Sequence, residues 1–567
     1  MGIKVDLVVY DCGGTWPGEL LAFRDFDLVT LGFSEDERTI DPDFTGIYNE
    51  NGSLNFFGYH TSMDWDVDLG TGKNEWYMKE GTQIMPSNSE DRIEHYWSWE
   101  NYLMDKILPL YPLFTPMEYT FYWSDSEGFS FADGILSSWG KMNWASSHEG
   151  QISTEEVVIA DYQWNDLNPI TNGYFNTELI SNAILDPLVF FDSDKSMWPH
   201  LAETIELIND THLRIKCRKG VKWQPDPDDL FNNEYFDAHD VYFTLFCWKH
   251  VSNDQHMFDW IKELEIVDSE TIDIFIDGNP ETEENDPYAP AYSRLGLHIL
   301  PEHYLNQTQI FDELPDFTHP SWQKFVNHCF GTGLFSLENY LEGSETILTK
   351  WDECWRLNTT LTSDPVLNYI ERLGDYSGGL EKLRIKIITH AEEAQAKFEG
   401  GKIDIVDFKY YPEPRREYFD YPDYSYQTDI KYRMNFMGMN MRTVRPVLGD
   451  RDPAPGDPTI TKGLAVRKAI AYAINRQEIN DLMHRGLYSD LHYPIYSKLG
   501  IWCNPDIIKY EYDLTEAKRY MKIAGYDVKD YTPTIGLHLE VIAILSISSL
   551  VFVLLKKRKE VEGKLRP

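Results

Sequence analysis

Acidic side chains at regular spacing are the first candidates for chemistry in this sequence. The segment DWDVDLGTGKNE at 64–75 places carboxylates at positions 1, 3, 5 and 12 of a calcium-binding loop. The sharp turn of such a loop requires glycine at position 6. This chain has Leu69 there, and Gly70 follows one position late. We therefore expect no metal site in this segment.

The cysteines and histidines are too scattered for a metal centre. The segment CWKH at 247–250 offers one Cys and one His near His239, which is too few ligands for zinc. We predict that these side chains pack a helix. No C-x-x-C pair occurs, so buried free thiols and one or two disulfides both remain open. The six cysteines are Cys12, Cys217, Cys247, Cys329, Cys354 and Cys503.

The motifs of common catalytic sites do not occur either. The sequence contains no G-x-S-x-G, no H-E-x-x-H and no phosphate-binding loop. We predict no catalytic residue, no metal and no cofactor, and so a protein that is not an enzyme. The formal net charge of −42 argues against nucleic acid as a partner, because phosphates need a basic surface.

The elements that must position a site follow from hydrophobic patterning. A length of 567 residues with 42% hydrophobic residues supports two to four domain-sized units. The patterns alternate between strand and helix, which predicts an α/β fold. We predict a buried strand at 1–14, an amphipathic stretch at 92–107 and a Gly/Ser-rich linker at 126–152. Further strands are predicted near 155–160, 213–217, 270–276 and 383–388, and helices near 237–249, 391–400, 462–484 and 513–524.

The C-terminal segment predicts a membrane anchor. Residues 535–555 are mostly apolar and long enough to cross a bilayer, and a basic cluster follows at 556–559. This asymmetry places the C-terminus in the cytoplasm and the main domain outside the cell membrane. The alternative is a buried C-terminal helix. Four N-glycosylation sequons are compatible with an external location: Asn51, Asn209, Asn306 and Asn358.

Short segments in a fixed order between residues 153 and 530 resemble one protein family. The ordered set is similar to the family 5 extracellular solute-binding proteins, which are the oligopeptide- and dipeptide-binding components of ABC importers. The segments include ILDPLVFFD at 184–192, RKGVKW at 218–223, FDAHDVYFTL at 236–245, GTGLF at 331–335, FEGGKIDI at 398–405 and VRKAIAYAINRQEIN at 466–480.

The N-terminal region resembles the part of the family that is missing after residue 530. FRDFDLVTLGFSEDERTIDPD at 23–43 resembles the family motif F-D-x-x-x-x-G-W-x-x-D-x-x-D-P, and SEDRIEHYWSWENYLMDKILPLYPLF at 89–114 resembles its last helix and returning strand. The two pieces complement each other. The chain is therefore either a circular permutation or the tail of one copy fused to the head of another, and we expect an incomplete N-terminus.

The resemblance implies a two-lobed, class II periplasmic-binding-protein-like fold with mixed sheets, plus the C-terminal transmembrane helix. It implies that 1–125 is the C-terminal portion of a solute-binding domain, which belongs mostly to lobe two. Residues 153–403 would form lobe one, 404–530 the first part of lobe two, and 531–567 the spacer, membrane helix and basic tail.

The implied function is to capture a solute, with peptide favoured, by closure of two lobes. The ligand would then pass to an ABC permease in the membrane without covalent chemistry. Two alternatives remain open: a cell-surface structural or adhesion protein that retains the fold, and an anchored hydrolase.

The resemblance also implies ligand-binding residues. Asp36 occupies the acidic position of the G-W-x-x-D motif, which in peptide binders pairs with the α-ammonium group of the ligand; the alternative is a solvated loop acid. Gly32 begins this motif and Phe33 replaces its Trp. Thr30 stands where some peptide binders carry an arginine that reads a carboxylate, so oligosaccharide and nickel ligands also remain open.

Two further residues are candidates for the binding cleft. Asn440 in FMGMNMR matches a cleft-facing segment, and Trp164 precedes NDLNP. The alternatives are a structural role for Asn440 and core packing for Trp164.

Overall fold

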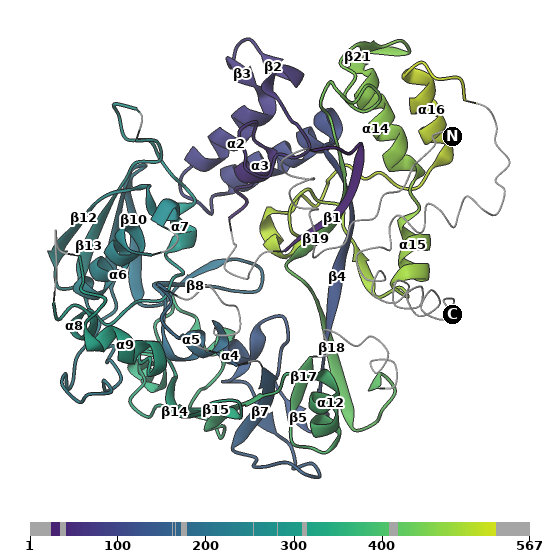
Figure 1. Ribbon diagram of the computed structural model, residues 1–567. Coiled ribbons are helices and arrows are strands. Elements are labelled where there is room, and N and C mark those ends of the chain that lie inside the picture. The colour runs from purple at the N-terminus through teal and green to yellow at the C-terminus, as the bar shows by residue number, and fades with distance from the viewer. Residues whose placement is uncertain are drawn as a thin grey trace, which may run out of the picture. The chain divides into compact units, whose positions relative to one another are not determined.

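The computed structural model describes residues 24–34, 41–161, 163–164, 166–171, 178–252, 255–280, 282–308, 314–407 and 418–528 (Figure 1). The predicted strand at 1–14, Cys12, Asp36 and the apolar segment 535–555 lie outside these residues. The chain divides into two compact units. Unit 1 comprises 1–82, 90–117 and 430–567, and unit 2 comprises 83–89 and 118–429.

The sheet of unit 1 is built from segments that are far apart in the sequence. Strand β1 (Leu28–Ser34) pairs antiparallel with β19 (Arg433–Met439), beside which it lies in Figure 1. The first half of β4 (Leu110–Trp123) pairs with β19 and with β22 (Tyr488–Asp490). The N-terminal region and the region after residue 430 therefore share one sheet.

Apolar side chains cover both faces of this sheet. On one face, Phe56, Trp99 and Trp502 pack with Phe436, and α3 (Glu90–Tyr102) contributes to this core. On the other face, Met437 and Met439 pack with α14 (Lys462–Ala473) and α16 (Leu514–Ile523). The predicted amphipathic stretch 92–107 corresponds to α3 and to the π-helical turn Leu103–Ile107 that follows it.

The predicted helix at 462–484 is two helices. After α14, Ile474 has extended backbone angles, and the side chain of Asn475 accepts a hydrogen bond from the backbone N–H of Glu478. This cap starts α15 (Arg476–Met483). The apolar spacing continues across the break, and periodicity alone therefore does not reveal it.

Unit 2 contains a mixed sheet and a smaller antiparallel one. The mixed sheet runs from the second half of β4 through β17 (Ile405–Asp407), β7 (Glu156–Asp161), β16 (Lys382–Ile387) and β15 (Glu345–Lys350) to β14 (Phe335–Leu341). Strand β7 is parallel to both neighbours. The smaller sheet has the order β10 (Ala202–Asn209), β11 (His212–Cys217), β13 (Thr271–Ile276), β12 (Ile261–Asp268).

The longest helix of unit 2 begins at a well-defined cap. Helix α6 (Ala238–His250) starts with a capping box. The side chain of Asp237 accepts a hydrogen bond from a backbone N–H of the first turn, and the side chain of Asp240 accepts one from the backbone N–H of Asp237. The other helices of seven or more residues are α2 (Lys73–Gln83) in the first part of the chain, then α5 (Glu178–Ile184), α9 (Pro320–Asn327) and α12 (Ala391–Glu399).

Residues 126–152, predicted as a linker, are packed into unit 2. They contain the short elements β5 (Ser126–Glu127), α4 (Gly134–Ser138) and β6 (Asn143–Trp144). The ring of Trp139 is buried, with its centroid 4.9 Å from that of Phe335 in an edge-on contact. Single buried aromatics in a Gly/Ser-rich segment leave no periodic signal, and composition therefore suggested a solvated loop.

The mixed α/β class predicted from the sequence is confirmed. The predicted strands correspond to β7, β11, β13 and β16, and the remaining predicted helices correspond to α6, α12 and α16. Over the part of the chain that the structure describes, no helix combines the length and the apolarity that a membrane span needs.

A buried ion pair ties together the aromatic core of unit 1. The side chain of Arg92 is fully buried, and both of its terminal nitrogens contact Asp41, at 2.7 and 2.9 Å. Its Nε donates to the carbonyl of Gly81 at 2.7 Å. The guanidinium lies 5.2 Å from the ring of Tyr96 and 5.1 Å from that of Trp502. Asp41 thus supplies a carboxylate in direct contact with the buried charge of Arg92.

We expect Asp41→Ala to destabilise unit 1 strongly. A buried guanidinium left without its carboxylate should lower the free energy of unfolding by about 3–5 kcal/mol. Urea denaturation followed by tryptophan fluorescence measures this loss. Glu516→Ala is the control, because it breaks the exposed Arg519–Glu516 pair and should cost less than about 1 kcal/mol. Equal losses in both variants would contradict the role of Asp41.

Candidate functional site

One face of the β1–β19 ladder is polar towards the end of β1, and we call this part of the face the polar shelf. It consists of Thr30, Gly32 and Ser34 of β1 with Arg433 and Asn435 of β19. Gly32 lies opposite Asn435, and Ser34 lies opposite Arg433. Because side chains alternate along a strand, these residues share one face and their neighbours point to the other. Ser34 is exposed and the rest are half-buried.

Gly32 is required by the side chains that lie over it. Arg433 Nε donates to Asn435 Oδ1 at 2.9 Å. A Cβ atom on Gly32 would lie 2.2 Å from Asn435 Oδ1 and 2.8 Å from Arg433 Nη2. Any larger residue at position 32 would therefore displace both side chains from the shelf. The shelf offers a cation, an amide and two hydroxyl groups, and so it suits hydrogen bonding to a polar ligand.

The structure separates two residues that the sequence placed in one motif. Gly32 lies on the shelf, whereas Phe33 lies on the opposite face. The ring of Phe33 contacts Phe436 at a centroid distance of 5.1 Å and Phe56 at 5.8 Å. This packing holds β1 in its register. Asp36, the predicted partner of a ligand ammonium group, lies outside the described residues.

Asn440 is buried and fastens the N-terminal segment to the end of β19. Its Nδ2 donates to the carbonyls of Arg24 at 3.1 Å and Phe26 at 2.9 Å. Its Oδ1 accepts from the backbone N–H and from Nη1 of Arg442, both at 3.2 Å. The amide group is thus occupied by contacts within unit 1.

Trp164 lies in unit 2 and is buried. Its Nε1 donates to Thr346 Oγ1 at 2.9 Å, and its ring lies 4.0 Å from that of Tyr340. Trp164 and the residues of the shelf thus belong to different units.

The acidic segment 64–75 is fixed within unit 1 by the hydrogen bonds of Asp64. Asp64 accepts hydrogen bonds from the hydroxyls of Tyr59 at 2.8 Å and Tyr102 at 3.1 Å, and from the backbone N–H of Asn74 at 2.8 Å. Burial raises the pKa of its carboxyl. Among the described residues, no group of three or more His, Cys, Asp or Glu side chains is placed to hold a metal ion. The five described cysteines are unpaired.

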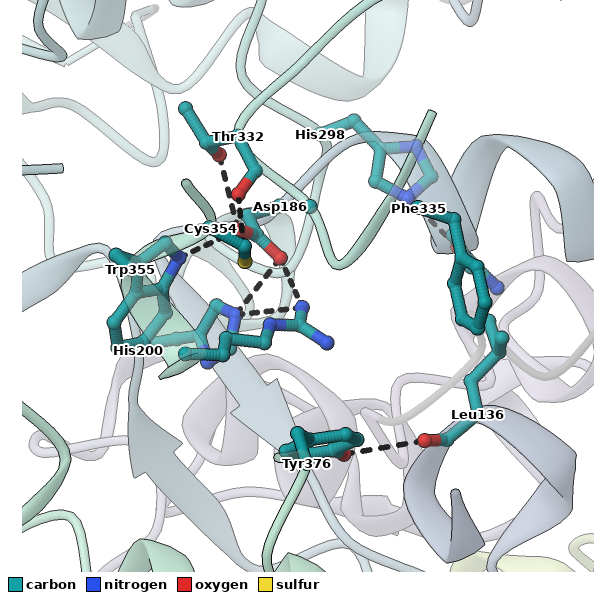
Figure 2. Close-up of polar contacts among 12 residues, drawn as sticks. Leu136, Asp186, His200, His298, Thr332, Phe335, Cys354, Trp355 and Tyr376 are labelled. Atoms are coloured by element: carbon teal, nitrogen blue, oxygen red, sulfur yellow. Dashed lines mark hydrogen bonds and ion pairs between the residues drawn. The ribbon is translucent and has the colours of Figure 1, made fainter. Parts of the chain in front are cut away.

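Unit 2 contains a buried charged cluster that the sequence did not reveal, centred on Asp186 (Figure 2). Its carboxylate accepts from Trp355 Nε1 at 2.9 Å and Thr332 Oγ1 at 3.0 Å, and it lies 3.0 Å from His200 Nε2. Arg356 completes an ion pair with it. Burial alone would raise the pKa of Asp186, but Arg356 and His200 hold it below the ordinary value.

The cluster is a structural support. It joins the hairpin β8 (Val189–Phe191) and β9 (Met197–Pro199) to the segments that carry Thr332 and Trp355. Nearby, burial raises the pKa of the Cys354 thiol to about 12, so this group is no nucleophile at neutral pH. In the sequence, this cluster is signalled by Asp186, an acid within the apolar run ILDPLVFF. Its basic partner Arg356 lies far along the chain.

The shelf of this mixed α/β chain offers a cation and hydrogen-bonding groups to a ligand. The family model "Bacterial extracellular solute-binding proteins, family 5 Middle" matches residues 197–546. This match covers more than half of the chain, and the chain therefore belongs to the family 5 bacterial extracellular solute-binding proteins. Members of this family bind solutes and are not enzymes. No curated protein matches the chain.

Several solved structures are similar to the chain over about two thirds of its length. They include the periplasmic binding protein DppA from Helicobacter pylori with peptide STSA, at 19% identity, 65% coverage of this chain and TM-score 0.39. Oligopeptide-binding AppA from Bacillus subtilis with a nonapeptide is similar at 18% identity, 68% coverage of this chain and TM-score 0.38. NikZ from Campylobacter jejuni with Ni(L-His) is similar at 17% identity, 65% coverage of this chain and TM-score 0.39. The chain spans 66%, 66% and 63% of their respective lengths.

We expect the stability of the chain to fall as the pH is lowered, in part through His200. Burial, with Arg356 and Arg218 opposing Asp186, lowers the pKa of His200 from 6.5 to about 4. A histidine with a lowered pKa stabilises the fold above pH 6.5 and loses this contribution as the pH falls towards 4. Between pH 7 and pH 5 the loss should be about 2 kcal/mol.

Urea denaturation at both pH values measures the loss. His200→Gln keeps an N–H donor for Asp186 and should be less sensitive to pH than the wild type by that amount. The control is His239→Gln, at an exposed position of α6, which should keep the wild-type pH dependence. A wild-type pH dependence in His200→Gln would show that His200 takes up no proton on unfolding.

Proposed function

We propose that this chain binds a small solute, with peptide favoured, outside the membrane for an ABC-type importer. Membership of a solute-binding family supports the binding role. As the sequence resemblance implies, capture would proceed by closure of two lobes around the ligand, followed by delivery to a permease. The apolar segment 535–555 and its basic flank would anchor the chain with its C-terminus in the cytoplasm.

The observation that favours peptide is the position of β1 at the edge of its sheet. Within the described residues, β1 pairs with β19 and with no second strand. Its free edge presents backbone N–H and C=O groups, which an extended peptide satisfies by adding as a further strand. The polar shelf lies on one face of this same strand and offers contacts for polar groups of the ligand.

The test is a ligand panel on the full chain. Peptides of two to five residues, malto-oligosaccharides and Ni(L-His) are each added, and the melting temperature is followed by tryptophan fluorescence. We expect peptides to raise the melting temperature with concentration, because ligand at a hundredfold excess over Kd stabilises the fold by about 2.7 kcal/mol. A response to sugar or to the nickel complex alone would reassign the ligand, and no response to any ligand would overturn the proposal.

A matched pair of variants connects this response to the shelf. Gly32→Ala places a Cβ atom against Asn435 and Arg433 and should weaken the peptide response. Gly46→Ala is the control, because a Cβ atom on this exposed glycine of unit 1 meets nothing within 4 Å. If both variants respond like the wild type, the shelf does not contribute to binding.

A further inference from the structure

The guanidinium of Arg433 lacks a charged partner. Among the described residues, no carboxylate lies within ion-pair distance of it. Acids are not scarce in the chain, which has 93 acidic and 51 basic residues.

The hydrogen bonds of Arg433 leave one side of the guanidinium open. Its Nε is bound to Asn435 Oδ1 at 2.9 Å, and no described residue accepts a hydrogen bond from Nη1 or Nη2. These two nitrogens form the part of an arginine that binds a carboxylate through two parallel hydrogen bonds. Asn435 therefore orients the guanidinium and still leaves its bidentate side available.

Two other arginines of unit 1 are already occupied. Arg442 donates to the carbonyls of Phe56 and Asn55, the latter at 2.9 Å. Arg445 forms an ion pair with Asp25 at 2.7 Å. These two arginines, at the other end of the β1–β19 ladder, thus have the partners that Arg433 lacks.

The strand opposite Arg433 carries no bulky side chain on the shelf. The residues of β1 on this face are Thr30, Gly32 and Ser34, which are small. The half-buried setting also matters, because a charge pair that is partly shielded from water interacts more strongly than one at an exposed site.

We propose that Arg433, held in place by Asn435, binds a carboxylate group of the solute. The inference rests on the proposed function and names the group that the shelf recognises. In a peptide this carboxylate belongs either to the C-terminus or to an acidic side chain. Both sources present the same planar pair of oxygens, which the open side of the guanidinium fits.

The experiment compares three probes on the full chain: tetraalanine as free acid, tetraalanine amide, and Ala-Ala-Glu-Ala amide. Dissociation constants are measured by calorimetry at pH 7. We expect the wild type to bind the free acid roughly ten- to hundredfold more tightly than the amide. Tight binding of the glutamate-containing amide would assign the site to an acidic side chain. Arg433→Gln should abolish the preference for a carboxylate, whichever source it has.

Two further variants separate binding from folding. Asn435→Asp supplies Arg433 with an internal carboxylate, so it should abolish the preference by forming a charge pair within the fold. Arg445→Gln removes a positive charge from the same unit but should keep the preference, because Arg445 is paired with Asp25. The melting temperature without ligand verifies that each variant is folded.

A ligand-independent measurement keeps the two proposals distinct. Citrate, compared with chloride at equal ionic strength, should raise the melting temperature of the wild type and Arg445→Gln more than that of Arg433→Gln. If the wild type binds no peptide, the peptide function is overturned and the citrate comparison alone decides on Arg433. An unchanged carboxylate preference and an unchanged citrate response in Arg433→Gln would overturn the role of Arg433.

Discussion

The pairing of β1 with β19 is the constraint on which unit 1 depends. Strand β19 lies between β1 and β4, and its residues Met434 and Phe436 are fully buried on one face. Phe56 and Trp99, from the N-terminal region, form much of the core that covers this face. The entropic cost of joining segments so distant in sequence grows only with the logarithm of their separation, whereas each buried aromatic adds a full hydrophobic contribution.

The same pairing determines where the polar shelf lies. A shift of one residue in the register would move Arg433 and Asn435 into the aromatic core and would expose Met434 and Phe436. The contacts of Phe33 with Phe436 and Phe56 oppose such a shift. The apolar face of the ladder thus fixes the geometry of the polar face, and a residue such as Phe33 supports a binding surface that it does not belong to.

Local patterns predicted much of the fold but little of the shelf. Helices α6, α12 and α16 have clear periodicity or caps within their own sequence, and they were predicted to within a few residues. The family motif indicated Gly32, but it did not show what lies over it. Arg433 and Asn435 become its neighbours only through pairing between distant strands, and no local pattern contains that information. The same reason explains why the Asp186 cluster, which joins 186, 200 and 356, was not predicted.

Buried and half-buried arginines differ in their partners, and this difference distinguishes a structural role from ligand recognition. Arg92 and Arg356 each have a carboxylate, Asp41 and Asp186, because a charge removed from water needs a partner. Where no acid is used, as for Arg442, backbone carbonyls accept the hydrogen bonds instead. Arg433 has only one neutral acceptor and keeps its bidentate side open. The contacts of Arg92, Arg356 and Arg442 support the fold, whereas the open side of Arg433 contacts no described residue and suits a negatively charged ligand group.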